Sequence, residues 1–173
     1  MVALRLWLVR HGATDWSEAG RLCGSTDVPL SRGGEAQADP IRRSLAARSF
    51  DGVWCSDLAR AREYARLAVG RATPDRRLRE LDFGELEGKR WDDLDPATRQ
   101  SLVRFEGFVA PGGESVAQLE ERVGRFLAEL GRGDHLVVTH GGVIRLLARR
   151  CGVLFAPQPG EMTVLEWDSV DAR

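Results

Sequence analysis

The chain has 173 residues, of which 43% are hydrophobic and 29% charged, and its formal net charge is −1. This length predicts one domain over residues 1–173. The near-neutral charge gives no general attraction to nucleic acid or to a membrane surface. Cys23, Cys55 and Cys151 form no CxxC pair, so neither a disulfide framework nor a zinc site is expected. No apolar stretch reaches the length of a membrane span, and we expect a cytoplasmic protein.

The amino-terminal part predicts a strand, a long loop and an interrupted helix. Leu4–Val9 is a short apolar run, typical of a buried strand, and Arg-His-Gly follows it. Residues 12–30 are rich in Gly, Ser, Thr and Asp and predict a loop. Ser31 can cap the helix that follows. Pro40 removes a backbone donor within that helix, so the helix should kink or break there.

The middle of the chain predicts further strands and helices. Phe50–Cys55 predicts the second strand, and Ser56 or Asp57 can cap a helix that ends at Gly70. Beyond it the pattern predicts a short third strand, a helix and a loop, over Arg77–Leu81, Trp91–Phe105 and residues 107–113.

The carboxyl-terminal part gives the strongest periodicity. Apolar residues recur at three- and four-residue steps from Val116 to Leu130, which predicts an amphipathic helix. His135–Thr139 predicts a buried strand, residues 143–151 a packed helix and Met162–Trp167 a last strand. Strands that alternate with helices imply an α/β fold, with parallel pairing and helices on both faces of one sheet.

Reactive side chains stand where three predicted strands end. Arg10 and His11 follow the first strand, Arg60 lies one helical turn beyond the second, and His140 follows the buried strand. The carboxyl ends of parallel strands share one edge of the sheet, where α/β proteins bind ligands. We therefore expect these four side chains to converge.

Such a cluster has the parts that phosphoryl transfer needs. Two guanidinium groups match phosphate oxygens, and the glycine pair Gly141-Gly142 begins a helix whose N-terminus favours an anion. A neutral histidine is a nucleophile, and neighbouring arginines should lower its pKa and keep it neutral. The missing part is an acid for the leaving oxygen. The carboxylate-rich stretch that holds Glu80, Asp82 and Glu85 follows the predicted third strand and could supply it.

Six segments resemble, in order, the motifs of the histidine phosphatase superfamily, in the branch shared by phosphoglycerate mutases and small phosphatases. They are LVRHGATDW (8–16), GRLCGSTDVPLSRGGEAQA (20–38), VWCSDLARARE (53–63), LRELDFGELEG (78–88), PGGESVAQLEERV (111–123) and LVVTHGGVIRLL (136–147). The resemblance implies a three-layer α/β/α sandwich around a mostly parallel sheet with one antiparallel strand.

The resemblance also implies roles. His11 matches the histidine that is phosphorylated, and Glu80 matches the proton donor. The residues expected to bind the substrate and its phosphate are Arg10, Ser17, Cys23, Gly24, Arg60, His140 and Gly141. Arg10, Arg60 and His140 are also expected to take part in catalysis. The resemblance implies catalysis without a metal ion or cofactor. It also implies a small-molecule phosphomonoester as the binding partner. A homodimer is left open as the assembly.

Two positions depart from the family's pattern. Ser17 stands where members usually carry Asn, and Tyr64 where they carry Thr; either packing or substrate contact is open for Tyr64. His135 lies five residues before His140, so alternation places it on the opposite face, in a structural role. Trp7, Trp54 and Trp91 are expected in the core.

Several functions compete on this pattern. Only residues 89–110 separate the acid region from the next motif, whereas mutases carry an insertion there, so a phosphatase is favoured over a phosphoglycerate mutase. The short chain most resembles the α-ribazole phosphatases of cobalamin synthesis, although broad-specificity phosphatases share these motifs. A non-catalytic phospho-ligand binder would be expected to lack His11 or Glu80. A metallohydrolase using the three histidines would need ligand spacing that is missing here.

Overall fold

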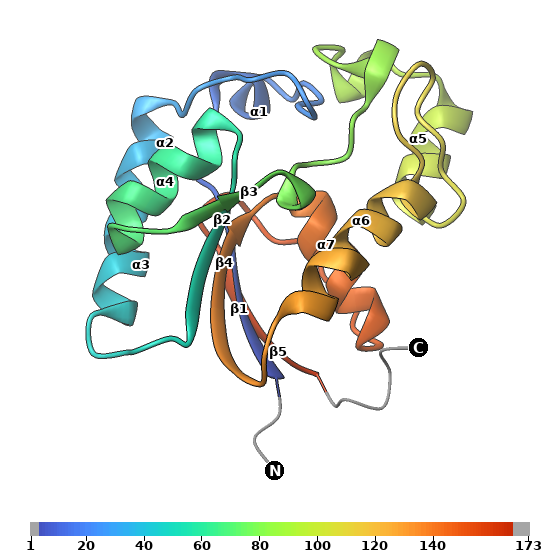
Figure 1. The fold of residues 1–173 in the computed structure, drawn as a ribbon. Coiled ribbons are helices and arrows are strands. Elements are labelled where there is room, and N and C mark those ends of the chain that lie inside the picture. Colours follow the sequence, from blue (N-terminus) through green and yellow to red (C-terminus); the bar gives the residue numbers. More distant parts are fainter. Residues whose placement is uncertain (1–3, 168–173) are drawn as a thin grey trace.

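The computed structural model describes residues 4–167 and contains a five-stranded sheet between two layers of helices (Figure 1). The strand order is β3-β2-β4-β1-β5, and every pairing is parallel except that of β5 with β1. The strands are β1 (Leu4–Arg10), β2 (Gly52–Ser56), β3 (Thr73–Asp75), β4 (Gly133–Thr139) and β5 (Met162–Trp167). This sheet confirms the predicted α/β fold class.

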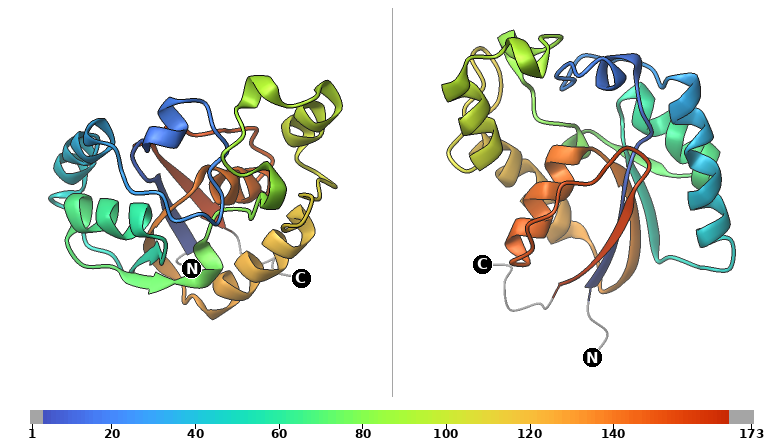
Figure 2. Two further views of the ribbon diagram at one scale, coloured as in Figure 1. Left: turned by 90° about the horizontal axis from the view of Figure 1, so that it is seen from above. Right: turned by 180° about the vertical axis from the view of Figure 1, so that it is seen from behind.

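Helices cover both faces of the sheet (Figures 1 and 2). One face carries α2 (Arg32–Ala36), α3 (Ala38–Leu45) and α4 (Ala59–Val69). The other carries α6 (Val116–Glu129) and α7 (Gly141–Arg150), with α5 (Pro96–Arg104) beside α7. A single turn, α1 (Asp15–Glu18), lies in the loop that was predicted over residues 12–30. Shorter 3-10 turns span Arg76–Leu78, Gly84–Leu86 and Trp91–Asp93.

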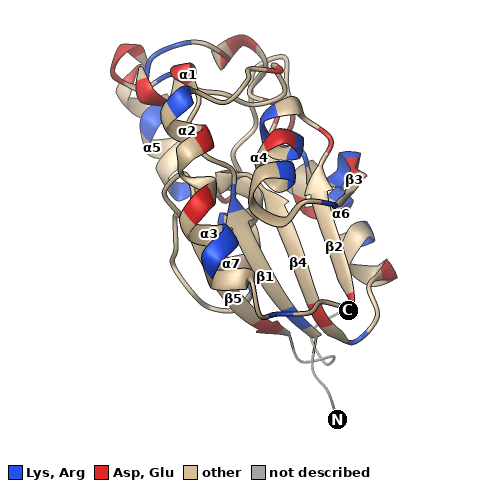
Figure 3. Ribbon diagram, turned by 90° about the vertical axis from the view of Figure 1, so that its left-hand side faces the viewer, with Lys and Arg blue, Asp and Glu red and all other residues tan. Residues whose placement is uncertain are grey.

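The alternation of side chains along β1 explains the two layers. Leu6 and Leu8 belong to the core under α6 and α7, whereas Trp7 and Val9 belong to the core under α3 and α4. Successive residues of a strand point to opposite faces, so a run that is apolar on both faces must be covered on both. Charged residues of both signs lie mainly on the helices and loops, and the few on the strands lie near the strand ends (Figure 3).

The third strand was predicted in the wrong place. The observed strand is Thr73–Asp75, and the predicted segment Arg77–Leu81 begins with a 3-10 turn. The Asp75 carboxylate accepts the backbone N–H of Arg77, which caps that turn and ends the strand. Leu78 and Leu81 are buried all the same, so their apolar character reflects burial of an irregular segment.

Two helix starts also differ from the prediction. Leu58 is the N-cap of α4 and offers no side-chain cap, while Asp57 forms an ion pair with Arg79 at 2.7 Å. The helix predicted over Trp91–Phe105 is split, because Asp95 caps a new helix that starts at Pro96.

The predicted break near Pro40 falls at Gln37, between α2 and α3. Pro40 then lies in the first turn of α3, where its missing N–H leaves no helical bond unmade. Within residues 4–167, every helix is too short or too polar to cross a membrane.

Candidate active site

The carboxyl ends of the parallel strands bring the predicted residues together. Arg10 on β1 is paired in register with Thr139 on β4, so His11 and His140 follow neighbouring strands. Their ring centroids are 4.9 Å apart. Arg60, in the first turn of α4, donates from Nε to His11 Nε2 at 3.2 Å. The four side chains therefore converge as the strand order predicts, at the upper edge of the sheet in Figure 1.

A cavity of about 280 Å³ opens above this edge. It lies between the loop after β1 and the segment after β3, which border the strand ends when the molecule is seen from above (Figure 2). Of the predicted residues, those that line it are Arg10, His11, Ser17, Cys23, Glu80 and Gly141. Arg60 and His140 are fully buried and lie against His11.

His11 is held as a neutral ring whose one lone pair, on Nε2, accepts the hydrogen bond from Arg60 Nε. Its Nδ1 lies 2.6 Å from the carbonyl oxygen of Gly12, a contact that requires the proton on Nδ1. Nε2 then carries the lone pair. Burial, and next the positive charge of Arg60, lower the pKa of His11 to about 3. The ring is therefore neutral near neutral pH, which is the form in which a histidine can act as a nucleophile.

Arg60 is fully buried and Arg10 is half-buried, and neither guanidinium has a carboxylate partner among residues 4–167. Arg60 donates from Nη1 to Thr26 O and from Nη2 to Gly24 O, at 2.9 and 2.6 Å. Arg10 donates from Nη1 to Pro157 O at 2.7 Å, and its buried Nε has no partner. Among the ion pairs of residues 4–167, none involves either guanidinium. Uncompensated buried charge of this kind suits an anionic ligand.

His140 adds unused hydrogen-bonding groups. Both ring nitrogens are buried and have no hydrogen-bond partner among residues 4–167. Burial, with the charge of Arg60 next, holds the pKa of His140 well below its usual value. A neutral ring carries one N–H, which can donate to a phosphoryl oxygen.

Glu80 is the one member of the predicted acidic trio that reaches the cavity. Its carboxylate accepts the backbone N–H of Leu81 at 2.9 Å and that of Gly142 at 3.0 and 3.1 Å. A Cβ at position 142 would lie 2.2 Å from Oε1, so Gly142 is needed for this approach. Asp82 instead accepts from Gly84 N, and Glu85 is exposed.

Glycines near the site serve packing as much as anion binding. A Cβ on Gly12 would lie 2.1 Å from Gly34 O, so this residue lets the loop after β1 meet α2. Gly24 offers Arg60 its carbonyl oxygen. Gly24 itself is not among the residues that line the cavity.

Ser17 and Cys23 lie at the cavity with restricted chemistry. The Ser17 hydroxyl donates to Thr14 O and accepts Thr14 N, both at 2.9 Å, as part of the cap of α1. Burial raises the pKa of the Cys23 thiol, which therefore stays protonated near neutral pH.

Two open questions from the sequence are answered by contacts. Tyr64 is fully buried and donates to Gln37 O at 2.8 Å, so it packs α4 against the α2–α3 junction and does not line the cavity. His135 contacts Gly131 O at 3.0 Å and Trp54 Nε1 at 3.4 Å. It serves a structural role, as alternation predicted.

The apolar wall of the cavity escaped sequence reasoning. Trp91, expected only in the core, packs against the core and also lines the cavity. The other apolar members are Leu22, Phe83, Leu102, Val103, Phe105, Ala156 and Pro157, and Arg21 and Arg145 add charge. These residues come from irregular segments and helix ends, whose paths no periodicity predicts.

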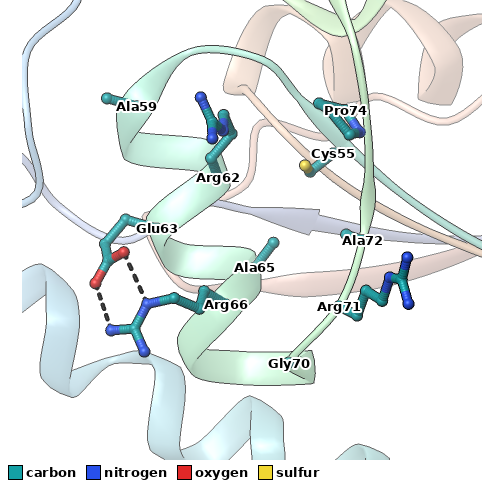
Figure 4. Close-up of a pocket in the computed structure, with 10 residues that line it drawn as sticks. All are labelled: Cys55, Ala59, Arg62, Glu63, Ala65, Arg66, Gly70, Arg71, Ala72 and Pro74. Atoms are coloured by element: carbon teal, nitrogen blue, oxygen red, sulfur yellow. Dashed lines mark hydrogen bonds and ion pairs between the residues drawn. The ribbon is translucent and has the colours of Figure 1, made fainter.

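A larger hollow, of about 450 Å³, lies between α4 and the segment that leads into β3 (Figure 4). Arg62 and Arg71 border it, and Arg66 forms an ion pair with Glu63 there. Burial raises the pKa of Cys55, another lining residue, to about 11. None of the predicted site residues lines this hollow, so size is a poor guide to the site. In the described part of the chain, no group of three or more His, Cys, Asp or Glu side chains could hold a metal ion.

Known proteins share this sequence and fold. Residues 6–168 match the histidine phosphatase superfamily (branch 1). The adenosylcobalamin/alpha-ribazole phosphatase of Salmonella typhi is 35% identical over 97% of this chain and 90% of its own. The probable phosphoglycerate mutase GpmB of Salmonella choleraesuis is 38% identical over 80% and 70%. The crystal structure of TTHB049 from Thermus thermophilus is 44% identical, with a TM-score of 0.88 over 95% and 94% of the two chains.

The chain belongs to the histidine phosphatase superfamily. Its family match and its phosphatase relatives make it an enzyme of the phosphatase class.

Proposed function

We propose that the protein hydrolyses a phosphomonoester through a phosphohistidine on His11, without a metal ion. The observation that carries this proposal is the state of His11: a neutral ring whose Nε2 lone pair lies beside a buried guanidinium. Arg10, Arg60 and the His140 ring N–H surround the place of the phosphoryl group and neutralise its charge.

In the first step His11 Nε2 attacks phosphorus while the bond from phosphorus to the alcohol oxygen breaks. Glu80 gives its proton to that oxygen, and the Nδ1–H contact with Gly12 O stabilises the imidazolium charge that develops. In the second step Glu80 takes a proton from water, whose oxygen attacks phosphorus as the P–N bond breaks. Inorganic phosphate leaves, and both residues return to their starting states.

The apolar wall supports an alcohol with a flat, aromatic part. Phe83, Trp91 and Phe105 line the cavity beside the phosphate position, and aromatic side chains bind planar groups by stacking. The Salmonella typhi relative is named an adenosylcobalamin/alpha-ribazole phosphatase. α-Ribazole 5′-phosphate, whose alcohol carries an aromatic base, is therefore the substrate we assign.

A groove continues outward from this wall and shares Val103, Arg145 and Ala156 with the cavity. It offers space for an alcohol larger than α-ribazole. The segment between the acid region and α6 forms one wall of the cavity but is short, which favours water over a second phosphorylated sugar in the second step. A mutase is accordingly not favoured.

Phosphate release tests the proposal. The panel contains α-ribazole 5′-phosphate, 3-phosphoglycerate, sugar phosphates and an aryl phosphate, each assayed in excess chelator with wild-type protein and with His11→Ala. We expect chelator-resistant release that His11→Ala abolishes, with the highest kcat/KM for α-ribazole 5′-phosphate. Release that survives in His11→Ala, or that requires a metal ion, would overturn the mechanism.

A further inference from the structure

The segment that carries Glu80 has no regular structure to hold it. It follows the 3-10 turn Arg76–Leu78 and belongs to neither a strand nor a helix. Its backbone is nevertheless buried in part, and the Glu80 carboxyl must point at Gly142 N in α7. Irregular backbone is mobile unless other parts of the fold hold it. The position of the Glu80 carboxyl therefore depends on contacts from other elements.

Arg122, in the middle of α6, supplies those contacts. It donates from Nη1 to Arg77 O and Arg79 O, both at 2.7 Å. It donates from Nη2 to Glu80 O at 2.9 Å. One guanidinium therefore binds three carbonyl oxygens of the segment, including that of the acid itself.

Glu114 completes the arrangement from the other side. Its carboxylate accepts Arg122 Nε at 2.7 Å and Nη2 at 2.9 Å. It also accepts Asp82 N at 3.3 Å, and its own N–H donates to Asp82 O at 2.9 Å. The pair holds the chain before, at and after Glu80.

The donor count shows how specific the arrangement is. Arg122 makes five hydrogen bonds, which equals the number of N–H donors that a guanidinium has. Lysine has three donors and no planar fork, so it cannot reproduce them. Both side chains of the pair are 15% exposed, and neither lines the cavity.

We propose that the Arg122–Glu114 pair is a positioning device that aims the Glu80 carboxyl at the leaving oxygen. This inference rests on the proposed role of Glu80 as proton donor. Neither side chain lines the cavity, and their hydrogen bonds go to the segment that carries Glu80, so their loss should mimic loss of the acid and leave the attack by His11 intact.

The test compares leaving groups. Arg122→Met, Arg122→Lys and Glu114→Gln are assayed with an alkyl phosphate, whose alkoxide needs a proton, and with p-nitrophenyl phosphate, whose leaving group does not. We compare kcat/KM, which reports the steps up to release of the alcohol, because Glu80 also serves the second step, which both esters share. We expect kcat/KM for the alkyl ester to fall on the order of 100-fold and kcat/KM for the aryl ester to fall by less than about 5-fold. In a Glu80→Gln background the same changes should add nothing. Arg122→Lys keeps the charge and stem, and it serves if Arg122→Met fails to fold.

Arg125→Met and Glu121→Gln are the matched controls, because they form an exposed ion pair on the same helix, and they should leave both rates unchanged. Equal losses on the two esters, or a further loss in the Glu80→Gln background, would show a merely structural role and overturn the inference. If Glu80→Gln itself lowers kcat/KM equally for both esters, the acid role in the proposed function fails, and the inference fails with it.

Discussion

Burial of His11 should make the stability of the fold depend on pH. The pKa of His11 is about 3 in the folded state and about 6.5 in an unfolded chain. As pH falls, the unfolded chain takes up the proton first. The stabilisation is therefore complete above about pH 6.5 and is lost as the pH falls toward 3.

The size of this effect follows from the shift. Inside that window each pH unit costs about 1.4 kcal/mol per histidine. Between pH 8 and pH 5 the loss from His11 amounts to about 2 kcal/mol. His140, whose pKa is also lowered by burial, changes stability in the same direction and remains in both proteins compared below.

Urea unfolding at pH 8 and pH 5, in buffer without phosphate, measures this loss. His11→Asn is the variant, since its amide N–H lies near the place of Nδ1–H. Between the two pH values the variant should lose about 2 kcal/mol less unfolding free energy than the wild type. Comparing pH values within each protein cancels the constant cost of the substitution. An identical pH dependence in both proteins would refute the buried, neutral state of His11.

Three further substitutions test the site. Gly142→Ala places a Cβ 2.2 Å from Glu80 Oε1 and should lower kcat/KM for alkyl phosphates on the order of 100-fold, with little effect on kcat/KM for an aryl ester. Glu87→Gln replaces the carboxylate that accepts the backbone N–H groups of residues 25 and 26, in the loop whose carbonyl oxygens bind Arg60. It should raise KM about 10-fold in initial-rate assays. Phe105→Ala removes an aromatic wall and should lower kcat/KM about 10-fold for α-ribazole 5′-phosphate, but not for a small alkyl phosphate.

Each of these substitutions has a control in the same region or residue class. Gly124→Ala lies in a helix where a Cβ would meet nothing within 4 Å, so it should leave activity unchanged. Glu85→Gln changes an exposed carboxylate two residues from Glu87. Val109→Ala shortens a side chain that is 64% exposed. Losses as large in these controls would show that the effects do not come from the site.

The sequence predicts the part of the site that depends on strand order. Arg10, His11 and His140 flank strands with clear apolar patterns, and parallel pairing turns their positions in the chain into neighbouring positions in space. Arg60 adds one helical turn, which is equally regular. For these residues a correct list of strands is enough, and the misplaced third strand did no harm because none of them depends on it.

Glu80 shows where that reasoning weakens. The motif singles out an acidic stretch, yet Glu80, Asp82 and Glu85 are distinguished only by the path of an irregular segment. The sequence offers no periodic signal for that path. In the structure the path is fixed by Arg122 and Glu114, which are more than 30 residues away in the chain.

The role of Glu87, a motif residue outside the cavity, also depends on the path of a loop. Glu87 accepts hydrogen bonds from Ser25 and Thr26, and burial, which by itself would raise its pKa, is outweighed by these bonds, so its pKa is lowered. The loop it holds gives Gly24 O and Thr26 O to Arg60. Arg60 in turn contacts His11. A carboxylate that does not line the cavity is thus joined to His11 through carbonyl oxygens. Because backbone carbonyls exist at every residue, no residue pattern could have marked this connection before the loop path was known.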